Sequence, residues 1–340
     1  MTTLMYQEAC ASATQVAIQL AANATSYEAL GAALRAAPPT GVVTIARGSS
    51  DHAASYFAYL VMARTGQLVT SLPMSLMTLY RAPMAHKGLL AVSVSQSGRS
   101  PDLYGPMQAF AAAGATTVAL VNAEQSPLTD VVEWALPLHA GPEKSVAATK
   151  SFICSLTAAA RLAAVWGEHA DLLQGLSTLP AALTAACDMN WSAAIPTLRT
   201  ADRLLVIGRG TGLSIANEAA LKFKETCGIQ AEAFSGAEVQ HGPMALVDTG
   251  YPMLIFALRG PAQAGLLQLA RDMRQRGANV LLAAPADVAE RDLTLVTSEA
   301  PDLDAIVAIQ SFYLLVEAVA RARGVNPDTP RHLSKVTSTL

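Results

Sequence analysis

Two groups of residues in the sequence have types and spacings that suit chemistry. The first is a cluster of hydroxyl side chains around Gly98, directly after the apolar run 88–92: Ser95, Ser97 and Ser100. Short hydroxyl donors at the start of a helix, where backbone N–H groups are unpaired, favour binding of an anion such as phosphate. Gly98 lets a ligand approach the backbone closely. A Ser-rich turn with an ordinary helix cap explains the same residues, so both interpretations stay open.

The second group lies on a strongly helical run at 217–225. Lys222 and Glu225 are three residues apart and therefore share one helix face, with Glu218 one turn earlier. A solvated ladder of ion pairs is one interpretation. The alternative is general acid–base chemistry, which gains weight because only 14% of the residues are charged and because His241 follows in a nearby loop.

The apolar segments around these groups predict parallel α/β sheets. Buried strands are expected at 42–46, 68–70, 88–92, 116–121 and 134–138, with helices between them. The pattern then repeats, because Arg47 and Arg209 are 162 residues apart, and so are Gly98 and Gly260. A steady offset indicates two copies of one unit. Since ligands bind beyond the carboxyl ends of parallel strands, and only the first copy has the Ser-rich turn, we expect the anion there and a different contribution from the second copy.

Long Ala-rich helices should flank the strands, at 4–36 with a break near 23–26, and at about 150–166 and 168–199. The organisation that we predict is an N-terminal helical segment, a first domain with its following helices, a second domain and a C-terminal tail that reaches the active site. Their expected bounds are 1–38, 39–192, 193–326 and 327–340.

Composition limits the classes of function. The chain of 340 residues is 52% hydrophobic with a formal net charge of -3, which suits large buried sheets and a subunit interface but neither nucleic-acid nor membrane-surface binding. Its cysteines are far apart in the sequence and lack metal-ligand spacing, which favours reduced thiols: Cys10, Cys154, Cys187 and Cys227. No signal peptide is evident, and no apolar run is expected to span a bilayer, so a cytoplasmic location is predicted.

Six motifs, in this order, resemble those of the sugar isomerase (SIS) family from about residue 40 to the C-terminus. They are Arg47-Gly48-Ser49-Ser50, Ser95–Gly98, Glu143–Lys150, Glu218–Glu225, Glu238–Pro243 and Pro330–Lys335. The chain is similar in particular to the isomerase half of glucosamine-6-phosphate synthase and to stand-alone aminosugar-phosphate deaminases. The resemblance implies an α/β fold with two tandem flavodoxin-like (SIS) parallel-sheet domains, and a homodimer.

The resemblance also implies a role for individual residues. The sugar phosphate would be held by Ser49, Ser50, Ser95, Gln96, Ser97 and Ser100, and the sugar lined by Val146 and Ala148. Glu225 would move a proton between C1 and C2, and Lys222 would stabilise the enediol oxygen. His241, from the neighbouring subunit, would assist ring opening, and Lys335 would belong to a terminal segment that closes on the open-chain sugar. No metal and no organic cofactor are expected, because Lys222 and hydrogen bonds would handle the enediol charge.

Three departures bear on the choice within the family. The synthase has a Cys where Arg47 stands, an acidic residue where Arg99 stands and a Ser where Ala148 stands. These changes are more typical of the stand-alone deaminases, and Arg99 is placed to reach the phosphate directly. The sequence, which begins with Met1, is also too short for a glutaminase half.

The hypothesis is therefore an isomerising deaminase that converts glucosamine 6-phosphate and water to fructose 6-phosphate and ammonia. Three alternatives remain. They are glucosamine-fructose-6-phosphate aminotransferase (isomerising) activity without a glutaminase half, a sugar-phosphate deglycase, and a non-catalytic sugar-phosphate sensor.

Overall fold

A computed structural model describes residues 2–84 and 86–335. These residues divide into two compact units, and each unit contains one parallel sheet of five strands. The first unit consists of Thr14–Glu143 and Lys150–Ser177, with Ser334 and Lys335. The second consists of the residues up to Ala13, Lys144–Thr149 and Thr178–Leu333.

The sheet of the first unit has the strand order β2-β1-β3-β4-β5, which is the flavodoxin-like order. Its strands are β1 (Gly41–Ile45), β2 (Val69–Ser71), β3 (Leu89–Ser95), β4 (Thr116–Val121) and β5 (Trp134–Pro137). The expected strands are confirmed, and Pro137 lies on an edge strand, where a missing N–H is tolerated. The accompanying helices are α2 (Ser12–Ala22), α3 (Ala24–Ala36), α4 (Ser49–Thr65), α5 (Ser75–Thr78), α6 (Pro101–Ala112), α7 (Pro127–Asp130), α8 (Lys150–Trp166) and part of α9 (Ala170–Cys187).

The sheet of the second unit has the order β10-β9-β8-β6-β7, which is the same order when the strands are counted from β6. Its strands are β6 (Arg203–Gly208), β7 (Gln230–Ser235), β8 (Pro252–Phe256), β9 (Asn279–Pro285) and β10 (Leu293–Leu295). The helices are α1 (Leu4–Cys10), α10 (Ile195–Arg199), α11 (Thr211–Lys222), α12 (Gln263–Gln275) and α13 (Asp304–Ala322), with shorter turns η1 (Ser192–Ala194), η2 (Phe223–Cys227), η3 (Glu238–His241), η4 (Pro243–Leu246) and η5 (Pro301–Leu303).

The two copies also agree in backbone detail. Gly48 precedes α4 with φ 55° and ψ -133°, and Gly210 precedes α11 with φ 63° and ψ -135°. This conformation is accessible essentially to glycine alone, so both strand-to-helix turns depend on that residue. The predicted fold class, two tandem flavodoxin-like α/β units, is confirmed.

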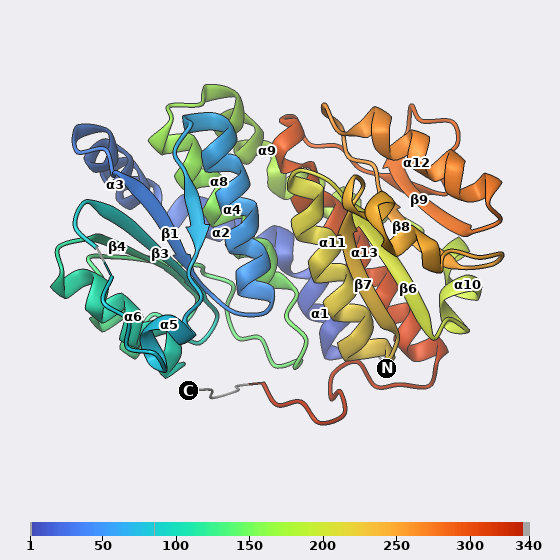
Figure 1. Cartoon of the computed structure of the whole chain (residues 1–340), viewed down its shortest axis with the longest axis horizontal. Coiled ribbons are helices and arrows are strands. Elements are labelled where there is room, and N and C mark those ends of the chain that lie inside the picture. The colour runs from blue at the N-terminus through green and yellow to red at the C-terminus, as the bar shows by residue number, and fades with distance from the viewer. Residues whose placement is uncertain (1, 85, 336–340) are drawn as a thin grey trace. The chain divides into compact units, whose positions relative to one another are not determined.

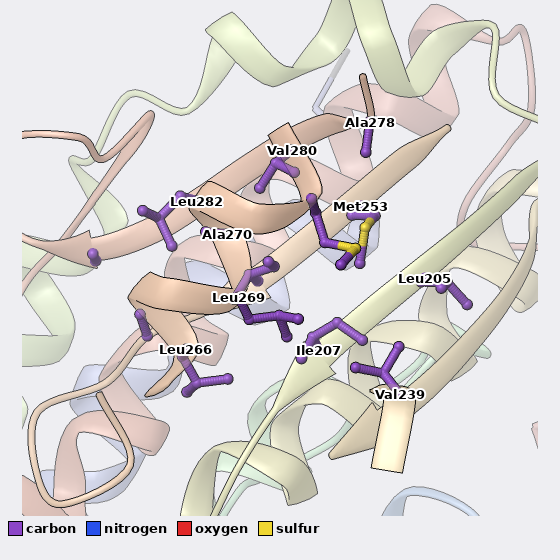
Figure 2. Close-up of a cluster of buried hydrophobic side chains, with 14 of the residues drawn as sticks. Leu205, Ile207, Val239, Met253, Leu266, Leu269, Ala270, Ala278, Val280 and Leu282 are labelled. Carbon is purple, nitrogen blue, oxygen red and sulfur yellow. The ribbon is translucent and has the colours of Figure 1, made fainter. Parts of the chain in front are cut away.

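The core of the second unit is built by alternation along its strands. Residues two apart point to one face of the sheet, and there Leu205, Ile207, Met253, Val280 and Leu282 pack against α12. Leu266, Leu269 and Ala270 of the helix belong to the same buried cluster, which Figure 2 shows. Helices α11 and α13 belong to the opposite side of the same sheet, where α11 contacts β6 and β7, and α13 contacts α11 and β10 (Figure 1).

An aromatic cluster joins that opposite face to the helix carrying Lys222. The ring of Phe312 on α13 lies 5.2 Å from Phe223 and 6.2 Å from Phe256, in edge-on geometry that favours aromatic pairs. Phe223 begins η2, which is a π-helical turn, and Gly228 ends it in a left-handed conformation. The expectation of one regular helix through Glu225 is therefore wrong, because α-helical geometry stops at Lys222.

Two further expectations need correction. The helix predicted at 168–199 is interrupted between Cys187 and η1. The segment Pro301–Ala322 is long and apolar enough to cross a membrane by length and composition, contrary to the expectation that no such run exists. However, 89% of its most apolar stretch is buried inside the protein, as in the core helix of a globular domain.

Candidate active site

The hydroxyl-rich turn of the first unit connects β3 to α6. Ser100 occupies the N-cap of α6 and Pro101 the first helical position, but among the described residues the Ser100 side chain accepts no capping hydrogen bond. Ser95 Oγ accepts a hydrogen bond of 2.9 Å from the Gly98 N–H and so shapes the turn. Arg99 is exposed beside it. These features weaken the ordinary-cap interpretation and leave the start of α6 suited to an anion.

Gly98 is required for a packing reason as well. Its φ is 61°, and a Cβ added there would lie 2.2 Å from Ser126 Oγ and 2.7 Å from Ser126 Cβ. The Gly98 carbonyl also accepts from the Leu128 N–H at 3.1 Å. The turn is therefore packed tightly against the β4–α7 connection, which holds its backbone in one conformation.

The turn between β1 and α4 lies at the same edge of the sheet, because β1 and β3 are neighbouring parallel strands. This is the switch point of the strand order, where ligands of such sheets bind. Ser49 and Ser50 open α4 and are half-buried. Arg47 forms an ion pair with Asp102, whose side chain is fully buried in the first turn of α6. The pair balances the Asp102 charge, so the helix start keeps its preference for an anion.

In the second unit, Lys222 lies between two carboxylates. Its Nζ is 3.1 Å from Glu218 Oε1 and 2.7 Å from Glu225 Oε2, and its side chain is 1% exposed. Glu218 is buried and accepts a further hydrogen bond of 3.2 Å from Tyr313 Oη. Burial alone would lower the pKa of Lys222, but the two carboxylates outweigh it and raise that pKa above its usual value. The trio is a buried ion-pair network and not the solvated ladder.

Glu225 is the partly exposed member of the trio, with 21% of its side chain accessible. A cavity of about 770 Å³ within the second unit is lined by Glu225 together with Lys224, Asp202, Arg323 and Arg331. Lys222 donates to Oε2 and fixes the orientation of this carboxylate. The arrangement provides an oriented base at the wall of a cavity with several cationic side chains.

His241 is exposed and ends the short turn η3, which follows β7. Glu225 lies in η2, which precedes β7. The six residues of β7 therefore separate the two groups along the sheet, by about 20 Å at the rise of a strand. Within one chain they lie at opposite edges of the same sheet and are not brought together.

Three other predicted residues lie in two segments that are far apart in the sequence. Val146 and Ala148 are half-buried in an irregular stretch of the second unit. Lys335 belongs to the first unit, and its Nζ is 3.1 Å from the buried Oε2 of Glu143. The Ser151 hydroxyl donates to the same oxygen at 2.6 Å. Residues 336–340 of the predicted tail lie outside the described residues.

Sequence reasoning missed several partners of these groups. Asp102, Glu143 and Arg331 stand inside or beside the quoted motifs, but nothing local to them indicates their contacts. Tyr313 lies on an apolar helix, and a tyrosine among aliphatic residues was the available signal for a buried hydrogen bond. Each pairing joins residues far apart in the chain, which a single sequence does not reveal.

The cysteines show one unexpected contact. Cys10 and Cys187 are far apart in sequence, yet a hydrogen bond from Cys187 lowers the pKa of Cys10 to about 7. All four cysteines are free thiols in the structure. Among residues 2–84 and 86–335, no group of three or more His, Cys, Asp or Glu side chains is arranged to hold a metal ion.

The buried trio makes a prediction about stability. Glu218→Gln keeps an oxygen for Tyr313 but removes one counter-charge from the buried ammonium, so the free energy of unfolding in urea at pH 7 should fall by about 1–3 kcal/mol. Stabilisation by a group with a raised pKa is complete below its unfolded-state pKa and is lost as pH rises through its folded-state pKa. With one carboxylate gone, the folded-state pKa of Lys222 should be lower, so that loss should be complete at a lower pH in the variant.

The matched control is Glu28→Gln, which changes an exposed carboxylate on α3. It should alter the free energy of unfolding by less than about 0.5 kcal/mol and leave its pH dependence unchanged. Equal stability of Glu218→Gln and the wild type would contradict the ion-pair network.

Comparison with known proteins agrees with the motifs. The SIS domain model matches residues 39–165 and 197–316. The glutamine–fructose-6-phosphate aminotransferase (isomerizing) of Thermus thermophilus is 32% identical over 322 residues, which are 90% of this chain and 53% of that protein. The enzyme of the same name from Zymomonas mobilis is 33% identical over 273 residues, 75% of this chain and 45% of that protein. The chain thus spans about half the length of the curated relatives that it matches.

Solved structures agree as well. A protein from Silicibacter pomeroyi described as a phosphosugar isomerase is 40% identical, with a TM-score of 0.89 over 96% of this chain and 100% of that one. The glucosamine-6-phosphate deaminase of Thermotoga maritima shares the fold at 19% identity, with a TM-score of 0.78 over 99% of this chain and 100% of that one. The resemblance expected from the six motifs is confirmed, and this chain belongs to the SIS domain family.

Proposed function

We propose that this chain is an aminosugar-phosphate isomerase and deaminase, which converts glucosamine 6-phosphate and water to fructose 6-phosphate and ammonia. The observation that carries the proposal is the Glu225 carboxylate, held by a buried ammonium and partly exposed at a cavity. A fixed carboxylate beside a cation suits proton transfer next to a carbonyl or imine. The 40% identity to the phosphosugar isomerase structure supports a phosphosugar as substrate.

The phosphate is assigned to the switch point of the first unit. Its ligands are proposed to be hydroxyl, amide and guanidinium groups of the two turns there: Ser49, Ser50, Ser95, Gln96, Ser97, Arg99 and Ser100. The start of α6 and the exposed position of Arg99 support this assignment. Val146 and Ala148 are proposed to line the sugar.

The reaction follows from these roles. After ring opening, Glu225 removes the proton from C2 of the open-chain aldehyde and returns it to C1. Electrons of the C2–H bond form the C1–C2 double bond of an enolamine, while the electrons of the C1=O double bond move to O1, which takes up a proton. Protonation at C1 and loss of a proton from the nitrogen then leave an imine at C2. Water adds to the imine and ammonia leaves. Lys222 is proposed to stabilise the charge at O1 while orienting Glu225, and Lys335 to act on the open-chain sugar.

His241 is proposed to assist ring opening from the neighbouring subunit of a homodimer. The support is geometric, because the length of β7 separates His241 from Glu225 in the same chain. A second copy supplies His241 without any rearrangement of that sheet. The exposed position of η3 is consistent with contact to another subunit.

Four further expectations are retained as proposals. The enzyme works in the cytoplasm, and it needs neither a metal nor an organic cofactor because protein cations balance the enediol charge. The boundaries at residues 38, 192 and 326 separate the N-terminal helices, the two SIS domains and the tail. The deaminating direction is favoured chemically, since hydrolysis of the imine needs only water as co-reactant.

The second candidate function is the isomerising aminotransferase reaction, which the names of the curated relatives favour. The two candidates share the proton transfer by Glu225 and differ in whether ammonia is released or consumed. A direct assay of ammonia separates them.

The purified protein should release ammonia from glucosamine 6-phosphate and form fructose 6-phosphate in equal amount, in an assay that measures both products. A panel of substrates that contains galactosamine 6-phosphate and N-acetylglucosamine 6-phosphate shows which epimer and which N-substituent the enzyme accepts. Consumption of ammonia and fructose 6-phosphate without any release would favour the aminotransferase. Release of an amino acid from a sugar-phosphate conjugate would favour the deglycase, and binding without turnover the sensor.

Mixing two inactive variants should restore activity if each site combines two subunits. In heterodimers of Glu225→Gln and His241→Ala, one hybrid site keeps both groups intact, so recovery should approach about a quarter of wild-type activity if half of the dimers are mixed. Subunit exchange is verified with differently tagged chains, and each variant mixed with itself is the control. No recovery after proven exchange would place both residues in one subunit's site.

A further inference from the structure

The segment Lys144–Thr149 has an irregular backbone, with neither helix nor strand in it. Such a segment owes its conformation to tertiary hydrogen bonds, because buried N–H groups must find partners outside regular structure. The proposed function places the sugar against two of its residues, Val146 and Ala148. Whatever holds the amides of this segment therefore shapes the sugar subsite.

Glu8 holds two of these amides. Its side chain is buried on α1, and its two carboxylate oxygens accept hydrogen bonds from consecutive N–H groups: Oε1 from Lys144 and Oε2 from Ser145, the latter at 3.2 Å. Hydrogen bonds to an ionised carboxylate are stronger than those between neutral groups. One side chain of the N-terminal helix thus fixes two successive peptide planes of the segment.

Asp328 accepts hydrogen bonds from a third amide of the segment and from the start of the helix that carries Glu8. Its carbonyl accepts from the Val146 N–H at 3.3 Å. Its carboxylate accepts from the N–H groups of Leu4 and Met5 at 2.8 and 2.7 Å, which are unpaired donors at the start of α1. The amides of three consecutive residues are therefore tied to α1 and Asp328 (the 144–146 clamp).

The clamp is anchored on the helix that also supports the candidate base. Thr3, the N-cap of α1, donates to Glu317 of α13 at 2.8 Å. Four residues earlier on α13, Tyr313 donates to Glu218 of the buried trio. Residues four apart share one helix face, so α13 positions both α1 and the trio.

We infer that Glu8 is a positioning residue for the sugar subsite, acting through the 144–146 clamp. The inference rests on the proposed function, because it takes the segment as the wall against which a sugar phosphate binds. It gives the N-terminal helix a role in recognition of the sugar and none in recognition of the phosphate. Affinity for the whole ligand and affinity for its phosphate should therefore respond differently to the loss of Glu8.

Glu8→Gln keeps the size of the side chain but replaces one acceptor oxygen by an N–H₂ group facing an N–H donor. Hydrogen–deuterium exchange of peptides covering 141–150 should become at least about tenfold faster, which corresponds to the loss of one hydrogen bond to a charged group. Glu28→Gln, at an exposed site on α3, should leave this exchange unchanged.

Binding is measured by calorimetry with two ligands. In Glu8→Gln, the Kd of fructose 6-phosphate should rise about tenfold, whereas the Kd of inorganic phosphate should stay within twofold of wild type. In Glu8→Ala both oxygens are lost, so the Kd of fructose 6-phosphate should rise further than in Glu8→Gln. This ranking of the two variants is a further check. A thermal unfolding transition near that of wild type establishes that each variant is folded.

Faster exchange with an unchanged Kd for fructose 6-phosphate would overturn the inference, because the clamp would then be purely structural. Unchanged hydrogen–deuterium exchange in Glu8→Gln would also overturn it, and so would an equal rise in the Kd values of both ligands. A wild-type protein that binds fructose 6-phosphate but releases no ammonia would defeat the proposed reaction, while the two binding constants would still test Glu8. The failure of one proposal is thereby distinguished from the failure of the other.

Discussion

A charged ammonium group that is removed from water must be surrounded by counter-charges, and in the second unit Lys222 imposes this requirement. Its side chain is 1% exposed, and Glu218 and Glu225 are within hydrogen-bonding distance on either side. Glu218 is itself buried and needs Tyr313 as a further donor. The network therefore extends from the π-turn η2 into α13, and it orients Glu225, the member of the trio that lines the cavity.

The apolar character of α13 follows from this supporting role. The helix packs Phe312 against the ring of Phe223, the residue between Lys222 and the rest of the π-turn. Glu317 of this helix also accepts a hydrogen bond from the hydroxyl of Thr3, the N-cap residue of α1. A helix with the composition of a membrane span is thus the internal scaffold of the second unit. Two of its polar side chains, Tyr313 and Glu317, form hydrogen bonds with other elements.

The two candidate catalytic residues of the second unit, Glu225 and His241, lie at opposite ends of the strands of its sheet. Helix α11 returns antiparallel to β6, so η2 lies at the amino edge of the strands, while η3 follows β7 at the carboxyl edge. Glu225 and His241 therefore face different ends of one sheet. In the first unit the Ser-rich turns lie at the carboxyl edge, at the switch point. The Ser-rich turns of the first unit and the proposed base of the second unit therefore lie at different ends of the strands of their own sheets.

Local sequence patterns were sufficient for the strands of the first unit, for the repetition of that unit, and for the hydroxyl-rich turn at the start of a helix. They also placed Lys222 and Glu225 on one face. They did not reveal the π-turn, because the register of a single helical turn depends on how Phe223 packs and on Gly228 at its end. They could not reveal the pairs Arg47–Asp102, Glu8–Lys144 and Lys335–Glu143, whose members are 55, 136 and 192 residues apart. Such pairs are products of the tertiary fold.

Proton transfer by Glu225 is tested by incorporation of solvent deuterium into fructose 6-phosphate, followed by NMR. Wild-type protein should exchange one hydrogen at C1, and Glu225→Gln should slow this exchange by at least about 10²-fold, the usual contribution of a general base. Glu238→Gln, which changes an exposed carboxylate elsewhere in the second unit, should exchange at the wild-type rate. Wild-type exchange by Glu225→Gln, or its loss in Glu238→Gln alone, would contradict the account.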